Sequence, residues 1–299
     1  MKKRSLLFRG TGTALVTPFR RDGAVDEVVM GELVERQLKG KIEALIPVGS
    51  TGEGATLSEV EQAAVIEMVV NQVNGRIPVI GGASANATGK AVALAKEAKR
   101  LGVDAILSVA PFYNKPTQEG IYQHFSAIAD AVELPIVIYN VPGRTASNIE
   151  ASTCLRLAEE IPYIAGVKEA SGNVSQIMEI LRHRPAGFGV WSGDDNLTLP
   201  LIALGADGII SVVSNESPAE FGTMVRWALK GKFDRARELH YRLLPLMNVN
   251  FIESNPIPVK AAMAMMGLME EQYRLPLTTL TEASRPRLQQ ALKSLKLIR

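Results

Sequence analysis

The sequence predicts an α/β fold, a (β/α)₈ barrel followed by further helices, and three observations support this prediction. β-Rich runs alternate with amphipathic stretches eight times in the first 231 residues of the 299-residue chain. The runs are near-continuous in apolar residues, which is typical of parallel strands buried on both faces. A right-handed strand–helix series of that length tends to close on itself. The competing architecture is an open doubly wound sheet, which usually begins with a glycine-rich dinucleotide loop, and GTGTAL does not fit that loop.

The eight predicted strands follow one another in a regular series. They are GTALVTPF (12–19), ALIPVGS (44–50), IPVIGG (77–82), DAILSVAP (104–111), LPIVIYN (134–140), IAGVKEA (164–170), FGVWSG (188–193) and DGIISVVS (207–214).

Two of the helices between these runs carry start signals. SEVEQAAVIEMVVNQV begins with Ser58 and has Glu61 three residues later, which is the spacing of a capping box. In SPAEFGTMVRWAL, Ser217 is the expected N-cap and Pro218 the first helical residue, with Glu220 in the first turn.

The pattern becomes purely helical after residue 231. KFDRARELHYRLLPLMN, PVKAAMAMMGLM and LTEASRPRLQQALKSL predict three helices packed beside the barrel. No low-complexity tract or long linker precedes them in the sequence, so we expect one compact subunit. Its parts are a catalytic barrel, residues 1–231, and a C-terminal helical extension, residues 232–299.

The composition is that of a soluble globular protein. Apolar residues make up 46% and charged residues 21%, and 33 basic against 31 acidic residues give a net charge of +2. This balance gives no electrostatic reason to expect a nucleic-acid or membrane partner. Cys154 is the only cysteine, which excludes an intrachain disulfide. The apolar run at 6–8 is too short for a signal peptide and no run has the length of a membrane span, so we expect a cytoplasmic protein.

Metal and serine-hydrolase chemistry have no support in the sequence. His124, His183 and His240 lie in predicted helices and not at metal-ligand spacing. Asp194 and Asp195 are expected to cap the helix after the seventh strand rather than to hold a metal. No serine lies in a G-x-S-x-G elbow.

In a barrel, active sites lie where strands end and the following loops begin. Polar and aromatic residues concentrate at these positions, in GSTGEG, PFYNKP, YNVPGRT, KEASGN, SGDDN and SVVSNE. The candidate site therefore lies at the carboxyl end of the predicted strands.

Lys168 is the most unusual of these residues, because it ends a strand with no preceding turn residue. An apolar setting disfavours the ammonium form and lowers the pKa of a lysine. With a pKa of about 8, roughly one lysine in ten is neutral at pH 7, against roughly one in 2500 at the ordinary value. A neutral amine in a dry pocket can form a Schiff base with a ketone. The alternatives are a lysine that extends to solvent or one paired with Glu169.

Neighbouring loops offer partners for such chemistry. Tyr139 ends the adjacent strand and could shuttle protons, with Tyr113 and Thr51 extending the relay; the alternative for each tyrosine is a core residue. The GSTGE loop could hold a carboxylate on its N–H groups, or its glycines could simply make the bend. Arg144 could bind a second carboxylate with its planar fork, or be a solvated loop residue.

The motifs GSTGE, YNVPGRT, GVKEASGN, SGDD and ESNPIPVK, in this order, closely resemble the pyruvate-dependent class I aldolases, the family typified by dihydrodipicolinate synthase. The resemblance runs from about residue 8 to the C-terminus. It implies a (β/α)₈ barrel that condenses pyruvate with aspartate semialdehyde on the pathway to diaminopimelate and lysine. It also implies a homotetramer arranged as a dimer of dimers. Neither a metal nor an organic cofactor is implied, because the Schiff base itself activates pyruvate.

The resemblance also implies roles for individual residues. Lys168 would form the Schiff base and Tyr139 would shuttle protons. Thr51 and Tyr113 would complete the relay, with Tyr113 reaching across a dimer interface. Ser50 and the loop amides would hold the pyruvate carboxylate, and Arg144 would receive the carboxylate of the aldehyde. Gly193 and Ile210 would line the pocket through their main chains.

Two alternatives remain at this point. Sialic acid and sugar-acid lyases share the lysine and the tyrosine, but VPGRT and ESNPIPVK are more similar to the synthases; Ser50 stands where synthases mostly have threonine. A non-catalytic barrel that senses a keto acid would have a broken relay, yet all four relay residues are present.

A further departure concerns regulation. Relatives inhibited by lysine use two histidines, a glutamate and a tyrosine where this chain has Glu59, Gln62, Lys90 and Phe112, while Asn86 is kept. Because Lys90 would repel the ammonium group of the ligand, we expect weak or absent inhibition by lysine.

Overall fold

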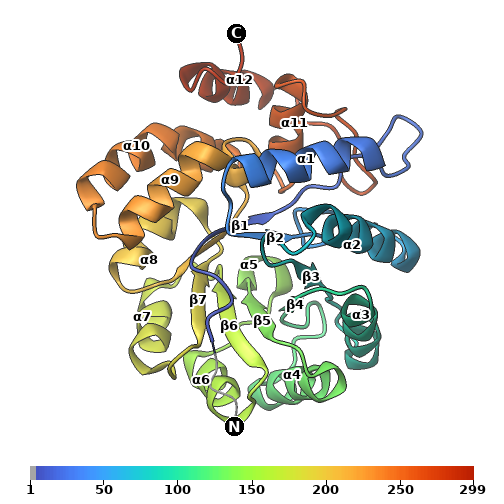
Figure 1. The fold of residues 1–299 in the computed structure, drawn as a ribbon, viewed down its shortest axis with the longest axis vertical. Helices are drawn as coiled ribbons and strands as arrows, with labels where there is room; N and C mark the ends of the chain where they lie inside the picture. The colour runs from blue at the N-terminus through green and yellow to red at the C-terminus, as the bar shows by residue number, and fades with distance from the viewer. Residues whose placement is uncertain (1–4) are drawn as a thin grey trace.

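The structure, a computed structural model, describes residues 5–299 and contains a parallel barrel surrounded by helices (Figure 1). Its strands are β1 (Gly10–Ala14), β2 (Ala44–Ile46), β3 (Ile80–Gly82), β4 (Ala105–Val109), β5 (Ile136–Asn140), β6 (Ile164–Glu169), β7 (Gly189–Ser192) and β8 (Gly208–Ser211). The helices within the barrel are α1 (Glu27–Lys39), α2 (Glu59–Val73), α3 (Thr88–Arg100), α4 (Gln118–Val132), α5 (Pro142–Thr145), α6 (Ala151–Glu160), α7 (Val174–His183), α8 (Thr198–Ala203) and α9 (Pro218–Leu229). Two 3₁₀ turns, η1 (Asp195–Leu197) and η2 (Val213–Asn215), follow β7 and β8.

The strands pair in parallel in the order β2-β1-β8-β7-β6-β5-β4-β3. A parallel bridge between Leu45 and Val79 joins the two ends of this series and closes the ring. The predicted (β/α)₈ barrel is therefore confirmed, and each of the eight predicted runs contains part of one observed strand.

The observed strands are shorter than the predicted runs, most of all at the first. β1 ends at Ala14, whereas apolar residues continue to Phe19. Val16 and Phe19 are buried although they lie outside the ladder. Burial alone therefore does not show where strand pairing stops.

The capping box predicted at α2 is present, and the Ser58 hydroxyl and the Glu61 carboxylate each accept the other residue's backbone N–H. The signal at α9 is only partly confirmed. Ser217 is the N-cap residue and Pro218 begins the helix, but the Ser217 side chain makes no capping hydrogen bond.

Strand side chains form two apolar layers of opposite orientation. Tyr139, Trp191 and Ile210 belong to the cluster inside the barrel, while Ile138 and Val167 face the surrounding helices. Since side chains alternate along a strand, Lys168 points inward from β6 beside Tyr139. Phe8 stacks on Trp191 with ring centroids 4.8 Å apart and closes the amino-terminal end of the barrel.

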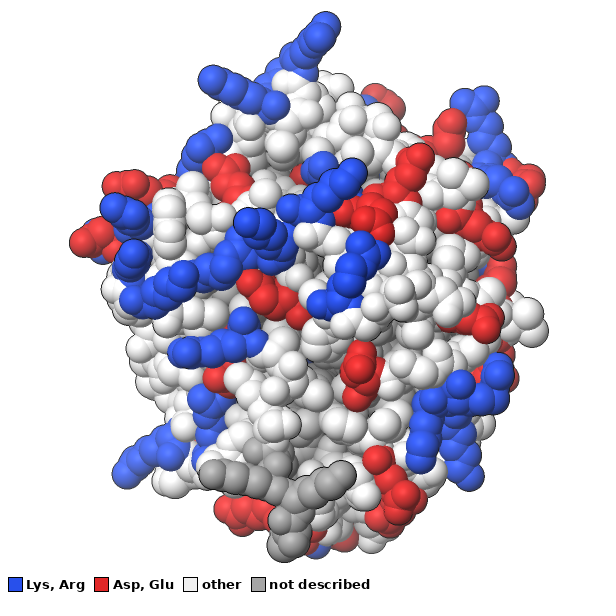
Figure 2. Space-filling view, in the orientation of Figure 1, with Lys and Arg blue, Asp and Glu red and all other residues white. Residues whose placement is uncertain are grey.

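Three helices follow the barrel, as the sequence predicts: α10 (Phe233–Val249), α11 (Ile257–Met265) and α12 (Arg285–Ser294). α10 packs along α9, and α11 lies beside α1 (Figure 1), where Val259 and Met263 share a buried cluster with Leu33. Within residues 5–299, no helix is both long enough and apolar enough to cross a membrane. Basic and acidic side chains are both scattered over the face in Figure 2.

Candidate active site

A cavity of about 360 Å³ lies at the carboxyl end of the strands. Loops that follow several strands line it together with a segment of the C-terminal extension. The residues that bear on the argument are Ser50, Glu53, Phe112, Tyr139, Arg144, Asn255, Pro256 and Leu277. The position agrees with the expectation for a barrel.

Lys168 lies inside the barrel behind this cavity, and only 5% of it is exposed. It pairs with Tyr139 in the register of β5 and β6, and its Nζ lies 4.2 Å from the centroid of the Tyr139 ring. Tyr139 lines the cavity and Lys168 does not, so the phenol ring lies at the boundary between them. A lysine that extends to solvent does not fit this burial.

Burial lowers the pKa of Lys168 to about 8. The carboxylates of Asp194 and Asp195 oppose this shift, and Arg144 adds to it. Burial also raises the pKa of Tyr139, so its hydroxyl stays protonated at neutral pH. The pair thus combines an amine with an accessible neutral form and a phenol that can donate a proton.

Glu169 does not neutralise Lys168, because the next residue of a strand points to the opposite face. Its carboxylate accepts hydrogen bonds from the Asn140 amide (2.9 Å), the Gln176 amide (3.2 Å) and the Ser171 backbone (3.2 Å). Pairing of Lys168 with Glu169 is therefore wrong.

Gly193 and Ile210 lie close to this pair. A Cβ atom at Gly193 would be 2.6 Å from the Ala170 Cβ and 3.1 Å from Cε of Lys168, so a side chain there would clash with Ala170 and crowd the lysine. Ile210 lies on β8 in the same buried cluster as Tyr139, and it is not one of the residues lining the cavity.

The two hydroxyls of the GSTGEG loop face different surroundings. Ser50 lines the cavity, whereas Thr51 is buried and its Oγ1 accepts a hydrogen bond of 3.0 Å from Nδ2 of Asn255. The structure thus places Ser50, and not Thr51, on the cavity wall.

Arg144 lies on the short helix α5, is exposed, and lines the cavity. Tyr113 does not line it, and its neighbour Phe112 does. The Tyr113 side chain is 88% exposed and its backbone has φ of 74°. Within one chain, Tyr113 is therefore separate from the other predicted relay residues.

Comparison with known proteins identifies the family of the chain. The model of the dihydrodipicolinate synthetase family matches residues 7–295. The chain belongs to this family. It is 54% identical over 94% of both chains to a 4-hydroxy-tetrahydrodipicolinate synthase of Koribacter versatilis. It is 51% identical to one of Chlorobium limicola, covering 98% of this chain and 99% of the relative. A crystal structure of the Acinetobacter baumannii dihydrodipicolinate synthase complexed with pyruvate is 45% identical, with a TM-score of 0.95 over 97% of this chain and all of that one.

The dihydrodipicolinate synthetase family was the family expected from the sequence motifs, and that expectation is confirmed. Sequence reasoning was only partly right about the two aspartates after β7. Asp194 is the N-cap residue of η1, but its side chain makes no capping hydrogen bond, and Asp195 does not cap this turn. The Asp195 side chain binds elsewhere. Its carboxylate accepts from the Ser211 hydroxyl (2.5 Å) and from the backbone N–H groups of Val212 and Val213 (both 3.2 Å). It therefore caps η2, because the turn after β8 brings its N–H groups against the neighbouring loop.

Sequence reasoning also missed four residues that connect the GSTGEG loop with the C-terminal extension. They are Glu53 within the loop and Asn255, Lys260 and Arg274 in the C-terminal extension. The available signal was the lysine inside the apolar segment PVKAAMAMM, where a charge requires a partner. In the part of the chain that the structure describes, no group of three or more His, Cys, Asp or Glu residues is placed to hold a metal ion.

Proposed function

We propose that this chain catalyses the condensation of pyruvate with L-aspartate 4-semialdehyde to 4-hydroxy-tetrahydrodipicolinate, through a Schiff base on Lys168. The observation that carries the proposal is the buried Lys168, with its lowered pKa, against Tyr139. Relatives about half identical over nearly the whole chain bear the name 4-hydroxy-tetrahydrodipicolinate synthase. The chain is a lyase of the diaminopimelate and lysine pathway.

The chemistry begins with the neutral amine of Lys168, which adds to the keto carbon of pyruvate. The carbinolamine loses its hydroxyl as water and leaves an iminium. Loss of a methyl proton then gives an enamine, whose carbon attacks the aldehyde. The amino group of the second substrate finally attacks the imine carbon, closes the ring and releases Lys168. No metal or organic cofactor takes part, because the iminium accepts the electrons.

Tyr139 is the group placed to move protons in these steps. Its ring contacts the Lys168 amine, and its hydroxyl is protonated at neutral pH. We place Thr51 of the same chain and Tyr113 of the partner subunit in this relay. The exposure of Tyr113 supports this assignment, because an 88% exposed tyrosine outside its own cavity is available to another subunit.

The two carboxylates bind to different residues of the cavity wall in this proposal. The pyruvate carboxylate lies against Ser50 and the loop amides, and Ser50 lines the cavity. Arg144 binds the carboxylate of the semialdehyde with its guanidinium fork. Gly193 and Ile210 contribute main-chain contacts near Lys168.

We further propose a homotetramer, a dimer of dimers. Within each dimer the relay draws Tyr113 from the second copy, and the association of two dimers is what the resemblance to the family implies. The cytoplasmic location stays a prediction of the sequence. So does the division into a catalytic barrel, 1–231, and an extension, 232–299.

A screen of aldehydes with pyruvate tests the proposed function. Product mass and pyruvate consumption are measured for aspartate semialdehyde and for sugar aldehydes under the same conditions. We expect turnover of aspartate semialdehyde to exceed that of any sugar aldehyde by at least ~10², the discrimination available when a charged partner is matched. Preference for a sugar aldehyde would instead identify a sugar-acid lyase.

A further inference from the structure

We propose that residues 255–260 of the C-terminal extension position the GSTGEG loop for pyruvate through two buried contacts, Asn255 with Thr51 and Lys260 with Glu53. The proposal rests on the proposed function, in which this loop holds the pyruvate carboxylate. It makes Asn255 and Lys260 positioning residues, which act through the loop and not on the reacting atoms.

The first contact is an ion pair between Lys260 on α11 and Glu53 in the loop. Both side chains are completely buried, and the Lys260 ammonium group donates to Oε1 of Glu53. The Lys260 Nζ also lies 4.2 Å from the ring centroid of Phe19 and 5.2 Å from that of Tyr273. A charge in this setting requires its partner, so α11 and the loop are held in one relative position.

The backbone of Glu53 has a conformation that is unusual for a residue with a side chain. Its φ of 53° lies in the left-handed region, which is strained for a residue with a side chain and persists where surrounding contacts hold it. A Cβ at the next residue, Gly54, would be 2.6 Å from the Val48 carbonyl oxygen, so the loop also packs closely on the chain before it. Glu53 itself lines the cavity, and its attachment to Lys260 therefore shapes the cavity wall.

The second contact is the hydrogen bond of 3.0 Å from Nδ2 of Asn255 to Oγ1 of Thr51. Asn255 is buried and lines the cavity beside Pro256. Because the Thr51 oxygen accepts this bond, its own hydrogen is left for another acceptor. The contact thus holds the Thr51 hydroxyl oxygen in place and leaves its hydrogen free to donate.

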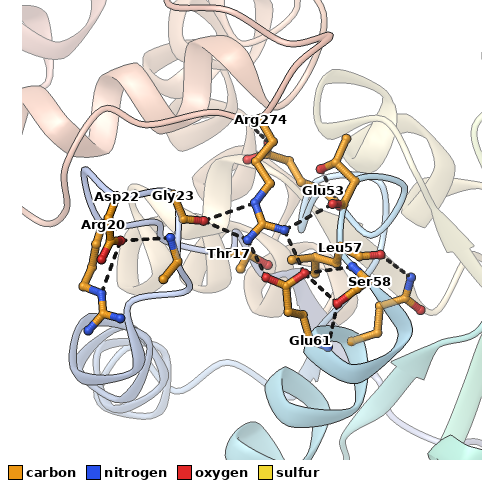
Figure 3. Close-up of polar contacts among 12 residues, drawn as sticks. Thr17, Arg20, Asp22, Gly23, Glu53, Leu57, Ser58, Glu61 and Arg274 are labelled. Carbon is orange, nitrogen blue, oxygen red and sulfur yellow. Dashed lines mark hydrogen bonds and ion pairs between the residues drawn. The ribbon is translucent and has the colours of Figure 1, made fainter.

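Arg274, which follows α11, holds the segment that connects the GSTGEG loop to α2 (Figure 3). Its guanidinium donates to the Gly23 carbonyl (2.8 Å), the Thr56 carbonyl (3.2 Å) and the Glu61 carboxylate (2.8 Å). Its backbone N–H donates to Oε2 of Glu53 (3.4 Å). The extension therefore contacts the chain from Thr51 to the start of α2, and we expect pyruvate binding to depend on these contacts.

The test uses Asn255→Ala and Lys260→Met, with Arg285→Met as the control. Arg285 lies in the extension, and its guanidinium donates to the Glu271 carboxylate and to the Leu280 carbonyl. Steady-state kinetics give kcat and the KM of each substrate, and thermal unfolding gives Tm. We expect the KM for pyruvate to rise at least ~10-fold in both loop variants, while the KM for the aldehyde changes less than ~3-fold. In Asn255→Ala we expect kcat to fall as well, because Asn255 donates to Thr51, a residue of the proposed relay. We expect the control to keep both KM values.

Asn255→Ala keeps the proposal testable if Lys260→Met fails to fold, because it removes a neutral hydrogen bond and leaves no buried charge. A pyruvate KM within twofold of wild type in a folded Asn255→Ala protein would overturn the proposal. So would a fall in kcat and Tm without a selective rise in the pyruvate KM. Borohydride reduction of the wild type with pyruvate distinguishes a failure of this proposal from a failure of the proposed function. An adduct combined with an unchanged pyruvate KM in the variants rejects the positioning role alone, whereas no adduct rejects the proposed function and this proposal with it.

Discussion

The amine of Lys168 lies 4.2 Å from the centroid of the Tyr139 ring, and the two residues are direct partners in the pairing of β5 with β6. Parallel pairing aligns their inward-facing positions, so the contact follows from the register of the barrel itself. The same inward position buries Lys168 and lowers its pKa to about 8. The register of two strands thus supplies both the amine and the adjacent phenol.

The first prediction concerns the stability that the buried lysine removes. The pKa of Lys168 falls from 10.5 to about 8 on folding, which corresponds to about 3 kcal/mol near neutral pH at about 1.4 kcal/mol per unit. Lys168→Met should therefore abolish activity while raising the free energy of unfolding at pH 7 by about 1–3 kcal/mol. Chemical denaturation of both proteins measures this, and a destabilised Lys168→Met protein would contradict it.

The lowered pKa determines how the contribution of Lys168 to the free energy of unfolding changes with pH. Between about pH 8 and 10.5 the unfolded chain holds a proton on Lys168 that the folded chain has lost, so the stability of the wild type rises with pH in that window. Lys168→Met lacks this contribution. Its stability advantage should therefore shrink from pH 8 to 10, and an advantage that grows would oppose the assignment.

The second prediction is the pH profile of Schiff-base formation. Because only the neutral amine reacts, the rate of adduct formation with excess pyruvate should rise about tenfold from pH 6 to 7 and level off above about 8. Single-turnover borohydride trapping at fixed pyruvate measures it. A rate that keeps rising to pH 10 would mean that the lysine has its ordinary pKa.

The third prediction separates the ring of Tyr139 from its hydroxyl. Tyr139→Phe keeps the ring beside Lys168 but removes the proton donor, so kcat should fall by about 10²–10⁴ with little change in Tm. Tyr122→Phe is the matched control, because that hydroxyl donates to Glu160 on the surface. Equal activity in the two variants would remove Tyr139 from the proton relay.

The fourth prediction concerns Arg144 at the cavity wall. Arg144→Ala should raise the KM for aspartate semialdehyde by about 10–10² and leave the KM for pyruvate within about threefold. The reason is that only the carboxylate of the aldehyde loses its guanidinium partner. Arg156→Ala is the control, because Arg156 is a surface arginine that pairs with Glu119. If the pyruvate KM rises instead, Arg144 binds the other carboxylate.

The fifth prediction is the absence of strong feedback by lysine. Lys90 pairs with Glu59 across a distance of 3.4 Å, so a cation of the protein already occupies this region. Lysine should therefore inhibit weakly or not at all in a steady-state assay. An inhibition constant in the micromolar range would contradict this reading of Glu59 and Lys90.

The barrel was predictable because its signals are local. The strands are continuous apolar runs, and the Ser58–Glu61 capping box lies within four residues. Strand ends were less accurate, since residues such as Phe19 are buried beyond the last ladder hydrogen bond.

The parts of the site that escaped prediction depend on contacts between distant segments. The Lys260–Glu53 and Asn255–Thr51 contacts each join residues more than 200 positions apart, and neither leaves a periodic trace in the sequence. The capping of η2 by Asp195 likewise depends on how two neighbouring loops meet. Local patterns could identify Lys168 and Tyr139 as candidates but not which groups hold the loop beside them.

The central claim is that Lys168 carries pyruvate as a Schiff base. The most direct measurement is intact mass after borohydride reduction with pyruvate, on the wild type and on Lys168→Ala. The account predicts one reduced pyruvate adduct on the wild type, located on the peptide that contains Lys168, and none on the variant. An unmodified wild type, or an adduct that persists in Lys168→Ala, would contradict it.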